Sequence, residues 1–571
     1  MDPFALSIVE GALVAASDEM FQVVRQTSYS PIIYEVLDYA TGITDANGRL
    51  VVQGNGVTGF LGSLSSGVQA VLQKYTDIGP GDVFIVNDPY TAGGSHLSDV
   101  TVVRPFFHNG TLLGFGASKA HWTEIGGAKP GSWSNDAADV YAEGLYIPLM
   151  KIVDRGVVNE TLMALIAANV RTPVYTLGDL QSQLGALVIG ERRVAEAAAK
   201  YGTETVLEAM ASILDRGRKA ALRALRRLPK GTYFAEDYLD SDGATDQPVY
   251  VCVKVTIDDD TFTADFTGSS PSVASTINAT WPSLECGVRT TFRALIDSEE
   301  PTSDGMFAPL SIICPPGTVF TAQPPTPVST YWEASDMAAD LVQKALAPHI
   351  PELMPAGHSL SVCGSILAFE RDPQSPTVGL PILVEPQAGG WGGSEGQDGE
   401  SALVPIGDGD TCSIPVEVLE ATYPVRVLEY ALNIVPGGGA GKYRGGFGLI
   451  RRLQLLQPAT LTASFGRHRF PAWGSHDGGN GTPNYVEVHA ADGRPLGRFG
   501  RVNGMRLEAG SVVALVTGCG GGYGDPKLRD PARVQEDLAN GFLTPEDARR
   551  IYGYPADAAQ GRESVDDENR N

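Results

Sequence analysis

Two histidines and an aspartate stand close together in the stretch from residue 83 to residue 125. His96 and Asp99 are three residues apart, directly after a Gly-Gly-Ser turn, and His121 ends a second apolar run. Imidazole nitrogens and carboxylate oxygens are ligands that Zn²⁺, Mn²⁺ and Fe²⁺ accept. Short His/Asp patterns also arise by chance, and both histidines could be hydrogen-bonded core groups. The position favours a metal, because the three residues lie at the ends of apolar runs, where α/β-type proteins gather their chemistry.

Three further acidic residues could take part in such a site. Asp38 interrupts an apolar, strand-like run, and a carboxylate there is costly unless it is paired or bound to a metal. It is therefore a candidate fourth ligand, with a solvent-facing edge position as the alternative. Glu124 and Glu143 lie within or beside the polar loop that follows His121. Either could be a general acid/base, and a solvated or capping glutamate is the alternative for each.

Helices and a hairpin are expected to position these residues in the N-terminal part of the chain. Apolar residues recurring every three or four positions predict helices over residues 3–28 and 62–76, and residues 158–227 are strongly helical in pattern. Residues 34–54 predict a β-hairpin. Its turn is Asp45-Ala46-Asn47-Gly48, in which Asn-Gly is the strongest local hairpin signal.

From residue 231 onward, apolar and polar residues alternate between Asp-Gly and Asp-Asp turns, which predicts antiparallel sheet. Helical patterns return at residues 277–297 and 332–348. The last third is β-rich and contains several glycine-rich loops. Near the end we expect a pair of short helices with Thr544 as an N-cap, followed after residue 556 by a disordered acidic tail.

The pattern as a whole predicts a mixed, multi-domain α+β fold. A helix-rich N-terminal half would carry the metal site, and the C-terminal half would be rich in antiparallel sheet. The expected divisions are an α/β metal-site domain at 1–230, a mixed β/α domain at 231–435, a β-rich domain at 436–526, and a helical segment with the acidic tail at 527–571.

Composition excludes several functional classes. The 571 residues carry 67 acidic and 42 basic side chains, and a net charge of -25 argues against nucleic acid as a partner. No run reaches the ~18 apolar residues of a membrane helix, and the first residues lack the basic start of a signal peptide. Six scattered cysteines without a CxxC motif suit a reducing cytoplasm. The glycine-rich loop at residues 385–402 lacks GxGxxG and Walker spacing, and no HExxH motif appears in the sequence.

Several long motifs, in the right order, resemble the hydantoinase B/oxoprolinase family. They are RQTSYSP at 25–31, ITDANGRLVVQ at 43–53, GDVFIVNDPYTAGGSHLSDVTVV at 81–103, EGLYIP at 143–148, PVEVLEATYPVRV at 415–427, GGAGKYRGG at 438–446 and GGGYGDP at 520–526. The family comprises the B subunits of ATP-dependent hydantoinases and lactamases, the C-terminal half of 5-oxoprolinase, and related subunits of acetone and acetophenone carboxylases. The similarity spans nearly the whole chain.

The resemblance implies a hetero-oligomer with a hydantoinase A-type ATPase subunit, which uses ATP to phosphorylate a carbonyl or amide oxygen. This chain would hold one divalent metal ion (Zn, Mn or Fe), with the family's ligands matching Asp38, His96, Asp99 and His121. The implied function is hydrolysis of a small cyclic amide. The alternatives are a subunit of an ATP-dependent ketone carboxylase and a non-catalytic scaffold subunit.

One position departs from the family pattern. Many members carry His-Leu-Gly where this chain has Phe60-Leu61-Gly62. If Phe60 faces the substrate, the substrate should be less polar than hydantoin or 5-oxoproline. Simple repacking of the core is the alternative.

Overall fold

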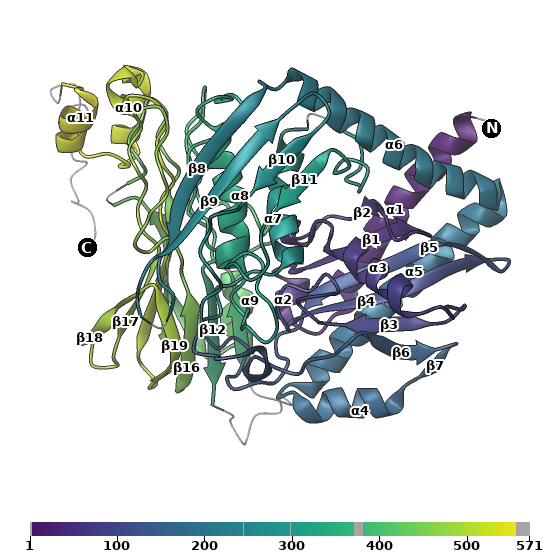
Figure 1. Cartoon of the computed structure of the whole chain (residues 1–571). Coiled ribbons are helices and arrows are strands. Elements are labelled where there is room, and N and C mark those ends of the chain that lie inside the picture. The colour runs from purple at the N-terminus through teal and green to yellow at the C-terminus, as the bar shows by residue number, and fades with distance from the viewer. Residues whose placement is uncertain (1–2, 244, 297–298, 371–380, 436, 556–571) are drawn as a thin grey trace, which may run out of the picture.

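Four β-sheets and their covering helices make up the fold, which is mixed α/β with mainly antiparallel sheets (Figure 1). The computed structural model describes residues 3–243, 245–296, 299–370, 381–435 and 437–555. The acidic tail predicted to be disordered lies outside these residues.

The first sheet has seven strands in the order β2-β1-β5-β4-β3-β6-β7, and each neighbouring pair is antiparallel. The predicted hairpin forms its edge. The strands are β1 (Tyr39–Asp45), β2 (Leu50–Gln53), β3 (Val83–Val86), β4 (Asp99–His108), β5 (Thr111–His121), β6 (Met150–Asp154) and β7 (Val157–Val158).

Helices cover both faces of this sheet. Val102 belongs to the core shared with α1 (Pro3–Thr27) and α5 (Pro173–Tyr201), whereas its neighbour Val103 packs with α3 (Ser63–Lys74). Successive residues of a strand point to opposite faces. Burial on both sides explains why the central strands read as apolar runs rather than as an alternating pattern.

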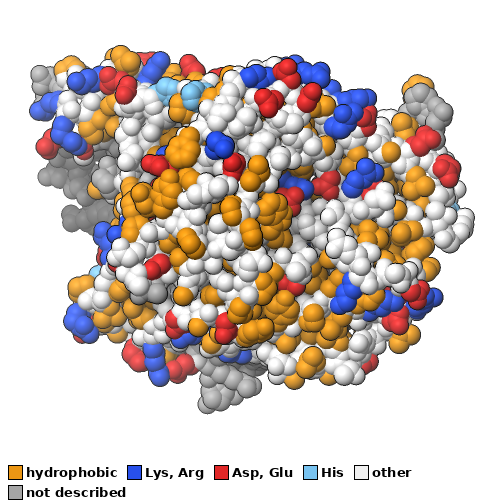
Figure 2. Space-filling view, in the orientation of Figure 1, with side chains coloured by type: hydrophobic (Ala, Val, Ile, Leu, Met, Phe, Trp, Pro, Cys, Tyr) orange, Lys and Arg blue, Asp and Glu red, His pale blue; other side chains and the backbone are white. Residues whose placement is uncertain are grey.

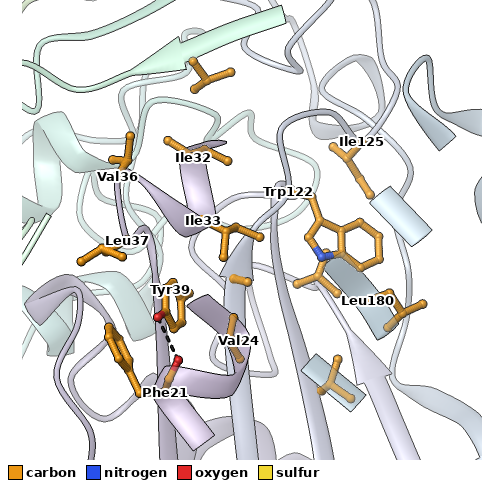
Figure 3. Close-up of a cluster of buried hydrophobic side chains, with 14 of the residues drawn as sticks. Phe21, Val24, Ile32, Ile33, Val36, Leu37, Tyr39, Trp122, Ile125 and Leu180 are labelled. Atoms are coloured by element: carbon orange, nitrogen blue, oxygen red, sulfur yellow. Dashed lines mark hydrogen bonds between the residues drawn. The ribbon is translucent and has the colours of Figure 1, made fainter. Parts of the chain in front are cut away.

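The predicted helical stretch at 158–227 is three helices: α4 (Glu160–Asn169), α5 and α6 (Thr203–Arg227). Gly202, with φ of 94°, separates α5 from α6. The short helix α2 (Pro31–Tyr34) leads from α1 towards β1. Figure 3 shows the apolar cluster here, in which the Tyr39 hydroxyl donates to the carbonyl of Phe21 at 2.9 Å.

The second sheet, β11-β10-β9-β8, packs against two helices. Its strands are β8 (Gly231–Leu239), β9 (Val249–Ile257), β10 (Phe262–Asp265) and β11 (Leu310–Ile313), and only the β10–β11 pair is parallel. The helices are α7 (Trp281–Ala294) and α8 (Trp332–Leu346). Every residue of α8 except Lys344 is buried, so protein surrounds this helix nearly throughout.

Two further sheets build the C-terminal part. The sheet β13-β12-β16-β19 contains β12 (Gly364–Phe369), β13 (Ile382–Glu385), β16 (Ala459–Ser464) and β19 (Arg501–Leu507). The sheet β14-β15-β20-β17-β18 contains β14 (Val425–Asn433), β15 (Gly448–Leu455), β17 (Tyr485–His489), β18 (Pro495–Phe499) and β20 (Val512–Val516). The former joins strands from both sides of the division expected at residue 436. The divisions between domains stay a prediction.

Three short helices accompany these sheets: α9 (Val416–Thr422), α10 (Pro531–Ala539) and α11 (Pro545–Tyr552). The N-cap prediction for α11 is confirmed, because the Thr544 hydroxyl accepts a hydrogen bond from the Asp547 amide at 3.1 Å.

The glycine-rich loops of the C-terminal part pack backbone against backbone. A Cβ atom on Gly445 would lie 1.9 Å from the carbonyl oxygen of Gly520, and one on Gly392 would lie 2.0 Å from that of Ala356. Such distances exclude any side chain. The abundance of glycine therefore reflects close approach of chain segments in this region.

Charges are dispersed over the face seen in Figure 2, where acidic and basic side chains alternate with apolar ones. All six cysteines are free thiols. Among the helices that the structure describes, none is both long enough and apolar enough to cross a bilayer.

Candidate metal centre

Three neighbouring strands bring the predicted ligands to one edge of the first sheet. Asp99 begins β4 and His121 ends β5, and the two are directly paired in register. Asp38 directly precedes β1, and its carbonyl oxygen accepts a hydrogen bond from the His121 amide at 3.1 Å. His96 lies in the loop before β4. Antiparallel pairing thus places residues from distant parts of the sequence side by side.

The donor atoms of His96, Asp99 and His121 form a compact triangle. His96 Nε2 lies 3.1 Å from His121 Nδ1, and both nitrogens lie 3.2 Å from Asp99 Oδ1. Ligand bonds of about 2.0–2.1 Å in a tetrahedral site give ligand–ligand separations of about 3.3 Å. All three side chains are buried. The spacing and the chemistry of these donors fit a divalent cation.

Surrounding groups orient the triangle. The Nδ1–H of His96 donates to the carbonyl oxygen of Ser329 at 2.8 Å, and this tautomer leaves the lone pair of Nε2 available to bind a metal. The Ser95 hydroxyl donates to Asp99 Oδ2, and Lys119 Nζ lies 4.0 Å from the same oxygen. Although burial opposes ionisation, neighbouring His96 and the hydrogen bond from His121 hold the pKa of Asp99 well below its usual range.

Asp38 lies beside the triangle and faces the cavity described below. Its Oδ2 is 3.8 Å from His121 Nδ1, and its side chain keeps 24% of its exposure. Removal from bulk solvent, partly offset by His121, raises the pKa of Asp38 to about 7. The preceding Leu37 has φ of 68°, a conformation that costs about 1 kcal/mol or more and often marks functional sites.

A cavity opens onto the triangle. Apolar side chains form much of its wall, including Ile32, Val57, Val362 and Val384. Five polar atoms of other lining residues are buried without a hydrogen-bond partner: the indole nitrogens of Trp133 and Trp332, Oδ2 of Asp336, Oδ2 of Asp408 and Oγ1 of Thr411. Unpaired buried groups are costly, so these atoms make the cavity a candidate ligand site.

Sequence reasoning missed these residues. Trp332 and Asp336 come from the buried helix α8, Trp133 from the polar loop after β5, and Asp408 and Thr411 from a loop after β13. One signal was available, since Asp336 lies among apolar residues of a predicted helix. Burial raises the pKa of Asp408 to about 7 and that of Asp336 well above its usual value.

Neither predicted acid/base glutamate lines the cavity. Glu124 accepts hydrogen bonds from the amides of Gly126 and Arg171 and forms a 2.5 Å ion pair with the Arg171 guanidinium. Glu143 Oε1 accepts from the amides of Val328 and Ser329 at 2.8 and 2.7 Å. Through these contacts, both glutamates hold neighbouring backbone segments in position. Their predicted role in proton transfer stays a prediction.

Phe60 is not among the lining residues either. It is buried in the core on the α3 side of the first sheet, and its ring centre lies 4.3 Å from Lys119 Nζ. The aromatic ring therefore packs under the ammonium group that neighbours Asp99. This position agrees with repacking rather than with direct contact to a substrate.

Comparisons with known proteins identify relatives of this chain. Residues 2–526 match the family model described as hydantoinase B/oxoprolinase. The caprolactamase subunit beta of Pseudomonas jessenii is 31% identical over 98% of this chain and 97% of its own length. The crystal structure of ATP-dependent caprolactamase from the same organism superposes with a TM-score of 0.89 at 28% identity, covering 100% of this chain and 98% of that one.

A second solved structure shares the fold. A chain of acetone carboxylase, in its nucleotide-free form, superposes with a TM-score of 0.87 at 19% identity, covering 97% of this chain and 79% of the other. Because the identity is low, this likeness concerns the fold alone.

Proposed function

Since the chain belongs to the hydantoinase B/oxoprolinase family, we propose that it is the metal-bearing subunit of an ATP-dependent cyclic amide hydrolase. In this proposal, an ATPase partner of the hydantoinase A type phosphorylates the carbonyl oxygen of the substrate, and this chain hydrolyses the activated compound. The two subunits together would form a hetero-oligomer.

The observation that carries the proposal is the buried triangle of His96, Asp99 and His121 at the end of a cavity with unpaired polar groups. The proposal takes Asp38, whose Oδ2 is 3.8 Å from His121 Nδ1, as the fourth ligand. When bound, Zn²⁺, Mn²⁺ or Fe²⁺ supplies Lewis acidity and promotes the ionisation of water. An amide is a poor electrophile, so an activating step before hydrolysis suits this chemistry.

The chain's own residues would bind and orient the activated amide. The apolar wall excludes bulk water, and the indole N–H groups of Trp133 and Trp332 can donate to substrate oxygens. The Asp408 carboxyl has an unpaired oxygen in the cavity and a pKa of about 7. A group that titrates near neutral pH can both give and take a proton, so we assign proton transfer to Asp408.

ATP consumption is assigned to the partner subunit because this sequence has no Walker motif. One structural relative is described as an ATP-dependent caprolactamase, and a sequence relative from the same organism is called a caprolactamase subunit beta. We therefore expect that the purified chain alone hydrolyses no ATP.

The test is phosphate release from ATP by the chain purified together with its ATPase partner. Lactams, hydantoins and ketones would be supplied in turn, with and without bicarbonate. We expect amide-dependent release that needs no bicarbonate, is lost in His96→Ala, and persists in His108→Ala, whose histidine ends β4 far from Asp99. Turnover of ketones only, and only with bicarbonate, would move the chain to the carboxylases. Full activity of His96→Ala would refute the metal centre.

A further inference from the structure

Apart from His96 and His121, the ionisable side chains that could carry charge in the cavity are carboxylates. Its eighteen lining residues, all within the described part of the chain, include four aspartates, namely Asp38, Asp99, Asp336 and Asp408, and neither lysine nor arginine. Lys119, the cation beside Asp99, does not line the cavity, and its ammonium group donates to the carbonyl oxygen of Gly93 at 3.1 Å. No protein cation is therefore free to meet an anionic ligand here.

The unpaired polar atoms suit a neutral amide. Trp133 and Trp332 each offer an N–H donor, whereas Asp336, Asp408 and Thr411 offer oxygens that can accept. A cyclic amide or imide presents an acceptor oxygen and a donor N–H beside an apolar ring. Burial of that ring against the valine-rich wall adds a hydrophobic contribution of about 25 cal/mol per Å².

We propose that this cavity selects cyclic amides whose ring carries no charge and discriminates against lactams that bear a carboxylate. The proposal rests on the function proposed above and narrows its substrate class. It concerns substituents on the ring of the substrate rather than its reacting carbonyl.

The physical reason holds in either protonation state of the lining acids. If Asp336 and Asp408 are ionised, a substrate carboxylate is repelled by like charges. If they are protonated, the carboxylate still leaves water and meets no cationic side chain of the lining, which is unfavourable. A carboxamide of nearly the same size avoids both costs. Discrimination should therefore follow charge and not volume.

A matched pair of ligands tests the selection without altering the protein. Five- and seven-membered lactams would carry either a carboxylate or a carboxamide on the ring carbon next to nitrogen. Amide-dependent phosphate release would be measured with the two-subunit complex, and binding of each ligand to the same complex by calorimetry. We expect the carboxamide to exceed the carboxylate at least tenfold in kcat/KM and in affinity. Equal values, or a preference for the carboxylate, would overturn the inference.

A pair of variants tests the cause. Thr411→Lys places a cation in the cavity, and Thr411→Met adds similar length without charge. The ratio of carboxylate to carboxamide affinity should rise about tenfold in the lysine variant and stay unchanged in the methionine variant. The same ratio in both would overturn the electrostatic argument. If no amide at all drives phosphate release, the proposed function fails, whereas turnover with the opposite charge preference contradicts this inference alone.

Discussion

Replacing Glu143 by glutamine should change how the stability of the protein depends on pH. The Glu143 side chain is buried beside the loop that supplies the Ser329 carbonyl oxygen to His96. Burial, which outweighs the hydrogen bonds from the amides of Ser329 and Val328, raises its pKa from 4.5 to about 8. The folded protein therefore holds a proton that the unfolded chain releases at neutral pH.

The sign follows from this difference. Between about pH 4.5 and pH 8 the folded state binds more protons at Glu143 than the unfolded state, so stability falls as the pH rises. A pKa difference of this size corresponds to at most about 5 kcal/mol, fully expressed above the higher pKa. Glu143→Gln imitates the protonated form, because its amide oxygen can still accept from both backbone N–H groups.

The assay is urea unfolding of both proteins at several pH values from 5 to 9. Relative to Glu143→Gln, the wild type should lose about 3.5 kcal/mol of unfolding free energy between pH 5 and pH 8. Glu204→Gln serves as the control, since Glu204 is exposed in the first turn of α6 and should leave the pH dependence as it is. Parallel curves for the wild type and Glu143→Gln would refute the reasoning.

Three further predictions concern packing and buried charge. Gly445→Ala should destabilise the folded protein by about 3 kcal/mol or more, because the added Cβ meets a backbone carbonyl oxygen. Gly11→Ala, which adds a methyl group in open space on helix α1, should stabilise the folded protein by about 0.5–1 kcal/mol. Thermal unfolding of both variants measures this difference. Arg451→Met should lower the unfolding free energy by about 3–5 kcal/mol, because it leaves Glu385 buried without its ion-pair partner at 2.6 Å. Adding Glu385→Leu should recover most of that loss, and the midpoints of urea unfolding test both variants. Lys119→Met should tighten Zn²⁺ binding in calorimetry, because it removes a positive charge 4.0 Å from Asp99, whose ionised form the histidines already stabilise, and weakened binding would contradict that.

The sequence predicted the elements whose signals are local. The hairpin turn at Asn47-Gly48, the helix ending at Thr27 and the cap at Thr544 each depend on a few neighbouring residues. The triangle of His96, Asp99 and His121 was also within reach, because all three lie in one stretch that folds as adjacent strands.

Other parts of the site could not be predicted because they depend on tertiary contacts. Asp336 and Asp408 are far apart in sequence, and only the packing of α8 against a glycine loop brings both to the cavity; a Cβ atom on Gly407 would lie 2.2 Å from Asp336 Oδ1. The glutamates illustrate the converse. Glu124 lies three residues after His121, yet its ion pair with Arg171 directs it away from the cavity.

Metal content is the most direct test of the central claim. Elemental analysis would compare the wild type, His96→Ala and the control His108→Ala, each purified in the same metal-containing buffer and then desalted. The account predicts about one zinc, manganese or iron ion per chain in the wild type and in His108→Ala, and much less in His96→Ala. Equal metal content in the wild type and His96→Ala, or none in either, would contradict a metal centre at the end of β4 and β5.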